Sequence, residues 1–308
     1  MTAAWEQIDG VLLLDKPRGL TSNAALQRAR RLYRAEKAGH AGTLDPLATG
    51  LLPCLFGEAT KFGGELLDAD KAYDATITLG VTTTTGDEEG EVVDRRPAAV
   101  AQAEVERVLA RFLGPVAQTP PMYSAIKRAG RPLYSYARAG VVVDRAPRTV
   151  MIHELTLAQF APDRLSLRVR CGKGTYVRVL AEDIGRALGC GGCLAALRRS
   201  AVGSLSAADA VSLEALEDLP AEARVLRLRR VDSLVEHLAA LTMESGVAAR
   251  FRRGQSVPGP RGGRGRFRVY GADGAFLGVG ELHGEDELRP RRLVRQDEHA
   301  PRTAARIL

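Results

Sequence analysis

The residue best suited to covalent chemistry in this sequence is a single aspartate in a glycine-rich stretch. Residues 39–50 read GHAGTLDPLATG, in which Asp45 is the one carboxylate among glycines, small residues and a histidine. A carboxylate can act as a nucleophile toward a sugar-like carbon. Glycoside hydrolysis usually needs two flanking carboxylates, and the next acid along the chain, Glu58, is thirteen residues further on. The pattern therefore predicts a site with one catalytic acid.

The same aspartate also has a purely structural interpretation. Aspartate is a favoured N-cap and proline suits the first helical position, so LDPLATG could simply open a short helix. That interpretation accounts for Asp45 but not for His40, Gly39 and Gly42. Glycines at these positions would let the backbone approach another surface closely. The residues alone leave both interpretations open.

Short elements with clear patterns surround this stretch and would position it. Residues 10–16, GVLLLDK, form an apolar run that ends at a proline and a glycine, which predicts a buried strand. A helix is expected from an N-cap at 21–23 to about residue 36. A strand rich in β-branched residues starts at Tyr73, and the segment TTTTGDEEGE after it predicts a polar loop.

The second half of the chain contains further elements of both kinds. A helix is expected at 103–113, and strict alternation at 164–171 predicts a half-buried strand. The next segment, GKGTYVRVLAEDIGRALG, turns into a helix for which Thr175 is a plausible N-cap. Tyr176 and Arg178 would lie in its first turn, away from the apolar face. After a break at 240–246, FRVYGADGAFLGVGEL predicts a hairpin in a small β domain.

Residues 118–148 differ in composition from the rest of the chain. They combine four prolines, three tyrosines and six basic residues. Rings can stack on bases while cations meet phosphates, so the mixture is typical of a nucleic-acid surface. A surface arm without a partner would have the same composition, and the pattern does not separate the two.

The positive charge of the chain is unevenly distributed. Of the net charge of +7, the segment 246–308 contributes +6, from 13 arginines against 7 acids. A basic segment suggests a polyanionic partner, because each neutralised phosphate releases counterions and adds affinity. A solvated surface is the alternative.

The overall composition, 308 residues with 45% hydrophobic and 26% charged, is typical of a soluble globular protein with room for two domains. The sequence contains no apolar run long enough to span a membrane and no signal-peptide pattern, so we expect a cytoplasmic location. The four cysteines form neither a disulfide framework nor a complete zinc pattern. We expect Cys190 and Cys193 to be ordinary thiols and predict no metal site.

Residues 39–62, GHAGTLDPLATGLLPCLFGEATKF, resemble the catalytic motif of the bacterial tRNA pseudouridine-55 synthases, the TruB family. Further stretches resemble that family in the same order: GVLLLDKPRGLTSN, KAYDATITLG, PMYSAIK with RPLYSYAR, CGKGTYVRVLAEDIG, LRR, and GVGEL with RPRRLV. The resemblance extends over about residues 9–295.

The resemblance implies an isomerase that converts uridine to pseudouridine at position 55, in the T-loop of tRNA, without a cofactor. The bond from N1 to C1′ breaks, the base turns, and C5 joins C1′, so one carboxylate suffices because nothing leaves. By similarity Asp45 is the catalytic nucleophile, and Arg178 is the arginine that pairs with it and keeps it ionised. Whether Asp45 attacks C1′ or acts otherwise stays open. Tyr73 resembles the tyrosine that stacks on the target base and could assist proton transfer.

The resemblance also implies residues that bind the substrate. Tyr176 and Leu197 resemble residues that line the uracil pocket. His40 resembles the residue that fills the place left in the RNA when the uridine is flipped out. Lys16 and Lys61 match family motifs and are either structural or in contact with RNA phosphates. Taken singly, each of these residues also has an ordinary structural explanation, such as packing or a turn.

The implied fold is α+β. We expect a catalytic domain at 1–240, with a mixed, largely antiparallel sheet flanked by helices and an RNA-binding arm at about 118–148. A PUA-like β-barrel at 246–308 would hold the acceptor-stem side of tRNA. We expect a monomer with no obligatory protein partner. Two alternatives are a guide-RNA-directed synthase, which shares the aspartate motif and the PUA domain, and a non-catalytic tRNA-binding folding factor.

Overall fold

The computed structural model describes residues 4–295 and contains two large β-sheets. The first has 11 strands, with the order β14-β1-β3-β12-β4-β11-β10-β7 along its main path. Strands β1 and β14 pair in parallel, as do β3 and β12, and the other pairs in this sheet are antiparallel. The expectation of a mixed, largely antiparallel sheet is therefore confirmed.

Strands of the main path lie far apart in the sequence: β1 (Gly10–Lys16), β3 (Thr49–Phe56), β4 (Lys71–Leu79), β7 (Gly114–Gln118), β10 (Arg148–Ala161), β11 (Arg164–Cys171), β12 (Gly192–Val202) and β14 (Val211–Ser212). Three short strands pair beside them: β2 (Ala38–His40), β13 (Leu205–Ser206) and β15 (Leu228–Arg229). Two small hairpins stand apart, β5 (Val81–Thr83) with β6 (Val92–Arg95), and β8 (Lys127–Arg128) with β9 (Arg131–Pro132).

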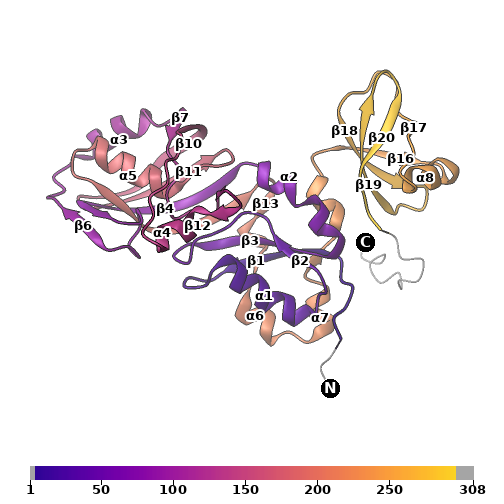
Figure 1. Cartoon of the computed structure of the whole chain (residues 1–308), viewed down its shortest axis with the longest axis horizontal. Helices are drawn as coiled ribbons and strands as arrows, with labels where there is room; N and C mark the ends of the chain where they lie inside the picture. The colour runs from indigo at the N-terminus through magenta and orange to yellow at the C-terminus, as the bar shows by residue number, and fades with distance from the viewer. Residues whose placement is uncertain (1–3, 296–308) are drawn as a thin grey trace.

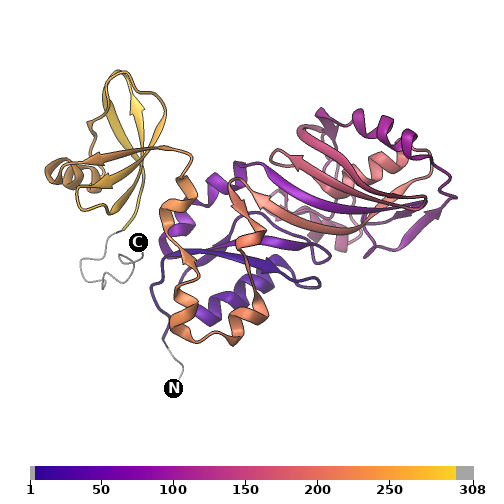
Figure 2. The ribbon, with the colours of Figure 1, turned by 180° about the vertical axis from the view of Figure 1, so that it is seen from behind.

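Helices gather in two groups along this sheet (Figure 1). The first group, α3 (Gln102–Ala110) and α5 (Val177–Ala187), lies beside β4, β10 and β11. The second group, α1 (Ser22–Tyr33), α6 (Leu213–Asp218) and α7 (Ala221–Val225), lies beside β1 and β3. Figure 2 shows strands of the sheet running from one group to the other. The segment η1 (Gly57–Phe62) and helix α2 (Gly63–Asp68) follow β3, and two further 3-10 segments, η2 (Ala207–Asp209) and η3 (Val231–Val235), follow β13 and β15. No helix in the described part combines the length and hydropathy that crossing a bilayer requires.

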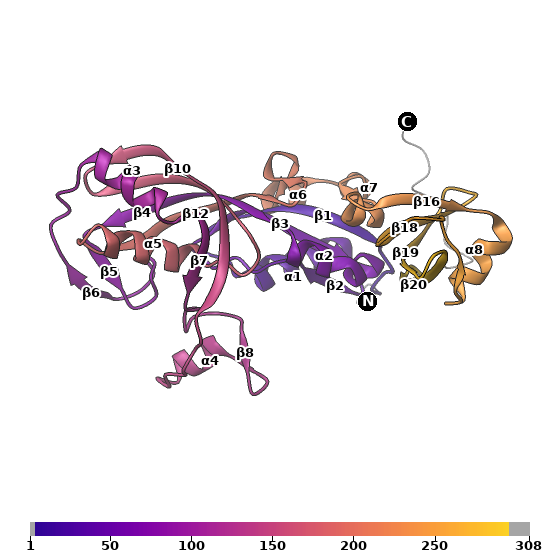
Figure 3. The same cartoon turned by 90° about the horizontal axis from the view of Figure 1, so that it is seen from above.

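The arm at 118–148 projects from the body of the molecule (Figure 3). It leaves the sheet at the end of β7, forms the β8–β9 hairpin and helix α4 (Leu133–Arg138), and returns at the start of β10. Because β7 and β10 are paired, with Gln118 opposite Arg148, the two ends of the arm lie side by side.

Several local expectations are confirmed and others are wrong. The strands at 10–16 and 164–171 have the expected bounds. The helix α1 ends at Tyr33 rather than near residue 36, because Arg34 takes a left-handed conformation with a φ of 52°. In α5 the N-cap is Tyr176 rather than Thr175, whose hydroxyl donates instead to the carbonyl of Gly172 at 2.9 Å.

The second sheet has five strands in the order β16-β18-β19-β20-β17. They are β16 (Ala239–Met243), β17 (Val257–Pro258), β18 (Arg266–Gly271), β19 (Phe276–His283) and β20 (Glu287–Leu293), with α8 (Ser245–Arg252) beside them. The hairpin expected from the sequence is β18 and β19. Residues 296–308 of the expected C-terminal domain lie outside the described residues.

The two sheets share one apolar cluster, which joins the small sheet to the rest of the chain. Phe62 of η1 and Leu66 of α2 belong to it, together with Phe276 and Val279 of β19. The rings of Phe62 and Phe276 lie 5.6 Å apart. An ion pair between Glu65 and Arg266 crosses the same boundary. The contact between the sheets is therefore apolar at its centre and charged at its edge.

Candidate active site

Asp45 lies in the segment between β2 and β3, and tertiary contacts hold that segment in place. The hydroxyl of Ser22, at the start of α1, donates to the carbonyl of Leu44 at 2.9 Å and accepts from its amide at 2.7 Å. Residues 45–48 are not helical, so the structural alternative, in which LDPLATG opens a short helix, is wrong. One local hydrogen bond, from the amide of Ala48 to the carbonyl of Asp45 at 3.1 Å, forms a turn, and contacts from distant parts of the chain position the segment.

Lys16, one of the two lysines with an open assignment, supports the same loop. Its side chain is fully buried, and Nζ donates to the carbonyls of Pro17 at 2.9 Å and Leu20 at 2.7 Å, with Pro46 at 3.5 Å. Burial lowers the pKa of Lys16 to about 8, although the carboxylate of Asp45 opposes that shift. A fully buried lysine with carbonyl partners stabilises the loop and has no exposed atoms to offer a phosphate.

The central ion pair of the site joins Asp45 to Arg178. Arg178 follows the N-cap of α5, and its Nε lies 2.9 Å from Oδ2 of Asp45. The same Nε lies 3.7 Å from Oδ2 of Asp87, in the loop after β5. The side chains of Arg178 and Asp87 are each 5% exposed, whereas that of Asp45 is 40% exposed. The buried carboxylate of Asp87 thus holds the Arg178 guanidinium on its protein side. Asp45 is the partner that a substrate can reach.

Two backbone carbonyls complete the coordination of this guanidinium. Nη1 of Arg178 donates to the carbonyl of Thr85 at 2.9 Å, and Nη2 donates to the carbonyl of Tyr123 at 2.7 Å. Tyr123 belongs to the arm. The Arg178 side chain therefore connects the loop that carries Asp45, the β5–β6 connection and the arm.

Opposing effects act on the pKa of Asp45. Burial raises it, the positive charge of Arg178 and their hydrogen bond lower it, and the negative charge of Asp87 raises it again. The net direction is upward. Because Arg178 is always charged, the pair retains an ionised Asp45 only above this raised pKa.

A second buried arginine, Arg199 of β12, supports Gly42 in the loop that carries Asp45. Its Nε donates to the carbonyl of Leu51 at 2.8 Å and its Nη2 to the carbonyl of Gly42 at 3.0 Å. Gly42 has a φ of +87°, and a Cβ there would meet the Arg199 guanidinium at 3.2 Å. This close approach explains why a glycine precedes Asp45 by three residues.

Tyr73 of β4 lies against the same arginine. A hydrogen bond with Arg199 and its positive charge lower the pKa of Tyr73, but burial outweighs both and raises it. The phenol therefore stays protonated at neutral pH. It can stack on a base and offer or receive a hydrogen bond without becoming charged.

These residues surround one cavity of about 400 Å³. Asp45, Arg178, Tyr73, Tyr176 and Leu197 all line it, so the structure brings together five of the eight residues named from the sequence. The cavity is large enough for a nucleobase and part of a ribose, and its walls include the rings of Tyr73, Tyr123 and Tyr176 and one accessible carboxylate.

His40 lies beside this cavity rather than in it. It lines an adjoining hollow of about 620 Å³ that also includes Asp45, Arg178 and, from the arm, Tyr134 and Arg138. Burial lowers the pKa of His40, as does the charge of Arg199, so the ring is neutral at physiological pH. Its Nδ1 is shielded from solvent and has no hydrogen-bond partner.

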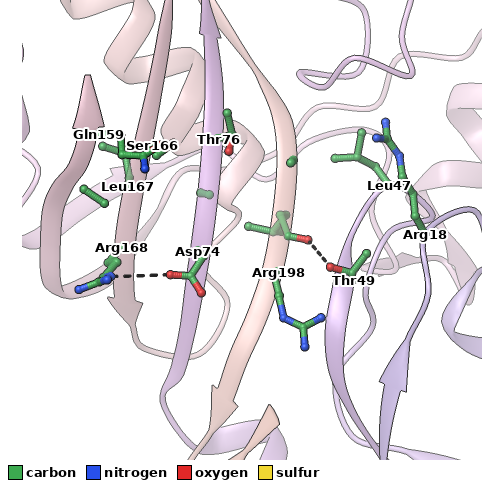
Figure 4. A pocket seen from close by; sticks show the side chains of 14 residues that line it. Arg18, Leu47, Thr49, Asp74, Thr76, Gln159, Ser166, Leu167, Arg168 and Arg198 are labelled. Atoms are coloured by element: carbon green, nitrogen blue, oxygen red, sulfur yellow. Dashed lines mark hydrogen bonds and ion pairs between the residues drawn. The ribbon is translucent and has the colours of Figure 1, made fainter. Parts of the chain in front are cut away.

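A separate hollow of about 500 Å³ lies on the opposite face of the sheet (Figure 4). Asp74 points into it from β4, toward Arg168 of β11 at 4.0 Å. Successive side chains of a strand face opposite sides, so Asp74 and Tyr73 are separated by the sheet. Leu197 borders both spaces, but Asp45 lines only the first.

Lys61 lies at the contact between the two sheets, away from the cavity. Its Nζ is 2.6 Å from Oε2 of Glu58 and donates to the carbonyl of Leu293 at 3.1 Å. The same oxygen of Glu58 accepts from the amide of Arg295 at 2.5 Å. Of the two uses left open for Lys61, these contacts favour the structural one.

The sequence did not single out Asp87 or Arg199. Asp87 lies within TTTTGDEEGE, and an acidic polar run is more typical of a solvated loop than of a buried site. Arg199 did carry a signal, because adjacent residues of a strand face opposite sides and Arg198-Arg199 must place one guanidinium inward. The four cysteines are buried and free, with Cys171 at the edge of the cavity.

Comparison with solved structures identifies the fold. The chain matches "Crystal Structure of a Cbf5-Nop10-Gar1 Complex" with a TM-score of 0.70 at 24% identity, covering 94% of this chain and 84% of that one. It matches "Structure of H/ACA RNP bound to a substrate RNA containing 2'-deoxyuridine" with a TM-score of 0.70 at 22% identity, covering 95% and 87%. At these identities the likeness concerns the fold.

Three family models cover most of the sequence. Residues 30–177 match the TruB family pseudouridylate synthase N-terminal domain, 178–236 the tRNA pseudouridylate synthase B C-terminal domain, and 239–294 the C-terminal domain of pseudouridine synthase II TruB. Fold and family models together define a pseudouridine synthase whose C-terminal sheet is consistent with a PUA-like domain.

The chain belongs to the TruB family, as its curated relatives also show. It is 55% identical to tRNA pseudouridine synthase B of Aromatoleum aromaticum over 287 residues, covering 93% of each chain. It is 54% identical to the protein of the same name in Burkholderia mallei over 295 residues, covering 93% of this chain and 97% of that one. The chain is thus a tRNA pseudouridine synthase, an isomerase, and tRNA is its substrate.

Proposed function

We propose that this chain isomerises the uridine at position 55 in the T-loop of tRNA, with Asp45 as the nucleophile and without a cofactor. The observation that carries the proposal is the 2.9 Å pairing of Asp45 with Arg178 at the wall of a cavity lined by Tyr73, Tyr176 and Leu197. A uridine paired inside a folded RNA must leave its stack to enter such a space, which costs a few kcal/mol.

The chemistry requires one carboxylate and a site that keeps the detached base in place. The N1–C1′ bond breaks, C5 bonds to C1′, the proton on C5 leaves and N1 gains a proton, so atoms and electrons balance without an external reagent. Asp45 supplies the electron pair or charge that assists cleavage, with Arg178 keeping it ionised. Tyr73, Tyr176 and Leu197 confine the base while it turns. The neutral phenol of Tyr73 would lie close to the base as the protons on C5 and N1 move.

The arm and the C-terminal sheet would hold the rest of the tRNA. In the arm, the guanidinium of Arg131 lies 5.3 Å from the ring centre of Tyr136, and that of Arg138 lies 5.6 Å from Tyr134. Alternating rings and cations suit the splayed bases of a loop. His40, beside the cavity, would fill the place that the uridine leaves. The C-terminal sheet would contact the acceptor-stem side, and the enzyme would act as a cytoplasmic monomer.

The test is modification of unmodified tRNA by the purified chain, without guide RNA or protein partners, followed by mapping of pseudouridine. We expect a single modified position, in the T-loop. Asp45→Asn should abolish modification while tRNA binding persists, and Asp74→Asn, which removes a carboxylate from the opposite face of the sheet, should leave both intact. Modification only with a guide RNA would support the guide-directed alternative. Modification retained by Asp45→Asn would exclude Asp45 as the nucleophile, and acceleration of tRNA folding by that variant would show a second activity.

A further inference from the structure

Four cations line the cavity that contains Asp45, and three of them have their donors committed to protein groups. Lys71 is buried and gives its ammonium protons to two backbone carbonyls at 2.6 and 2.7 Å. Arg178 pairs with Asp45, and Arg199 binds two carbonyls and Tyr73. The fourth cation, Arg148, differs from these three.

Arg148 is held in place by its neighbours, but not all of its hydrogen-bond donors have partners. It begins β10, where the arm rejoins the sheet, and its guanidinium lies 5.2 Å from the ring centre of Tyr176. Its Nη2 donates to the carbonyl of Gly174. Its Nε is shielded from solvent and has no hydrogen-bond partner, and in residues 4–295 no carboxylate forms an ion pair with it.

The backbone of Tyr176 has another support. The side-chain amide of Gln118, opposite Arg148 on β7, accepts from the Tyr176 amide at 3.1 Å and donates to its carbonyl at 3.3 Å. Gln118 is almost fully buried. Because these two hydrogen bonds already position Tyr176, holding that residue does not account for a positive charge at position 148.

We infer that Arg148 binds a backbone phosphate next to the flipped uridine, an inference that rests on the proposed function. A guanidinium with free donors and no carboxylate needs an anion, and the phosphate is the anion that every nucleotide brings into this cavity. The Tyr176 ring covers one face of the guanidinium, which leaves its edge for phosphate oxygens. A small rotation of the side chain would bring Nε to such an oxygen. Arg148 is then a substrate-binding residue that sets how deeply the nucleotide enters.

The experiment uses the full-length chain and a synthetic RNA hairpin of the tRNA T-arm. One version is all-phosphate, and two others carry a neutral methylphosphonate directly 5′ or 3′ of the target uridine. Dissociation constants and single-turnover rates are measured for the wild type, Arg148→Ala, Arg148→Lys and Arg168→Ala. Arg168→Ala removes the same charge from the opposite face of the sheet and serves as the matched control. Thermal melting and near-ultraviolet circular dichroism report whether each variant is folded.

For the wild type we expect one methylphosphonate to weaken binding about tenfold to a hundredfold, the factor for losing a charge-assisted hydrogen bond. Arg148→Ala should weaken binding of the all-phosphate hairpin by a similar factor. The affinity of this variant should be the same for the hairpin that carries that methylphosphonate. Arg148→Lys should recover part of the affinity, and Arg168→Ala should respond to the methylphosphonate as the wild type does. If a methylphosphonate on either side of the uridine weakens binding by Arg148→Ala as much as it weakens binding by the wild type, the phosphate contact is excluded. Binding is also measured in an Asp45→Asn background, so a failure of the proposed catalysis leaves this test intact.

Discussion

Ser22 and Leu44 exchange two hydrogen bonds, from hydroxyl to carbonyl and from amide to hydroxyl, at the residue that directly precedes Asp45. Both partners are buried, so Ser22→Ala would leave an amide and a carbonyl without partners. We expect a loss of about 1–3 kcal/mol in the free energy of unfolding and a clear fall in the single-turnover rate. Chemical denaturation and rapid-quench assays measure the two quantities.

The matched control for this prediction is Ser212→Ala. Ser212 caps α6, where its hydroxyl accepts from the amide of Ala215 at 3.1 Å, far from the cavity. Loss of that cap should cost about 1 kcal/mol of stability and leave the rate of the folded enzyme unchanged. Equal rate losses in the two variants would show that Ser22 affects the fold in general and not the position of Asp45.

The pH dependence of catalysis should respond to Asp87. If Asp45 acts as the ionised nucleophile proposed above, the rate should fall as the pH drops through its raised pKa. The charge of Asp87 contributes to that rise, so Asp87→Asn should lower the pKa of Asp45 and move the acid limb of the normalised rate to lower pH. Single-turnover rates across the acid range measure the limb. Asp74→Asn should leave it in place, and a shift of the Asp87→Asn limb to higher pH would contradict the proposed coupling.

The affinity for tRNA should depend on salt concentration through the basic C-terminal segment. Arg261 and Arg264 are exposed in the loop before β18, and neither forms an ion pair within the described part of the chain. If both meet phosphates, Arg261→Ala with Arg264→Ala should reduce the slope of log affinity for tRNA against log salt by roughly 1 to 2. The control pair is Arg289→Ala with Arg291→Ala, because those arginines already face Glu287 and Glu281. Identical slopes for the two double variants would mean that only net charge matters.

The sequence predicted much of the fold and part of the site. Strict alternation at 164–171 sufficed for β11, because the side-chain period of a half-buried strand is local information. The resemblance to the TruB family supplied Asp45, Arg178, Tyr73, Tyr176 and Leu197, which the structure places around one cavity.

What the sequence did not predict depends on contacts between distant residues. The loop that carries Asp45 was open to a helical interpretation because the contacts of Ser22 and Arg199 that hold it come from elsewhere in the chain. The acidic loop after β5 gave no sign that Asp87 is buried beside Arg178. The lysines at 16 and 61 matched family motifs, but a motif match does not say whether a side chain faces carbonyls or RNA.

The apolar cluster that joins Phe62 and Leu66 to Phe276 and Val279 limits how this enzyme can be rebuilt. A chimera that exchanged only the five-stranded sheet for that of another RNA-binding protein would set an unmatched surface against η1 and α2. The graft would then expose aromatic surface and aggregate, unless residues 57–68 were transferred with it. The C-terminal sheet is thus not an interchangeable module, because its apolar contact surface is matched to residues 57–68.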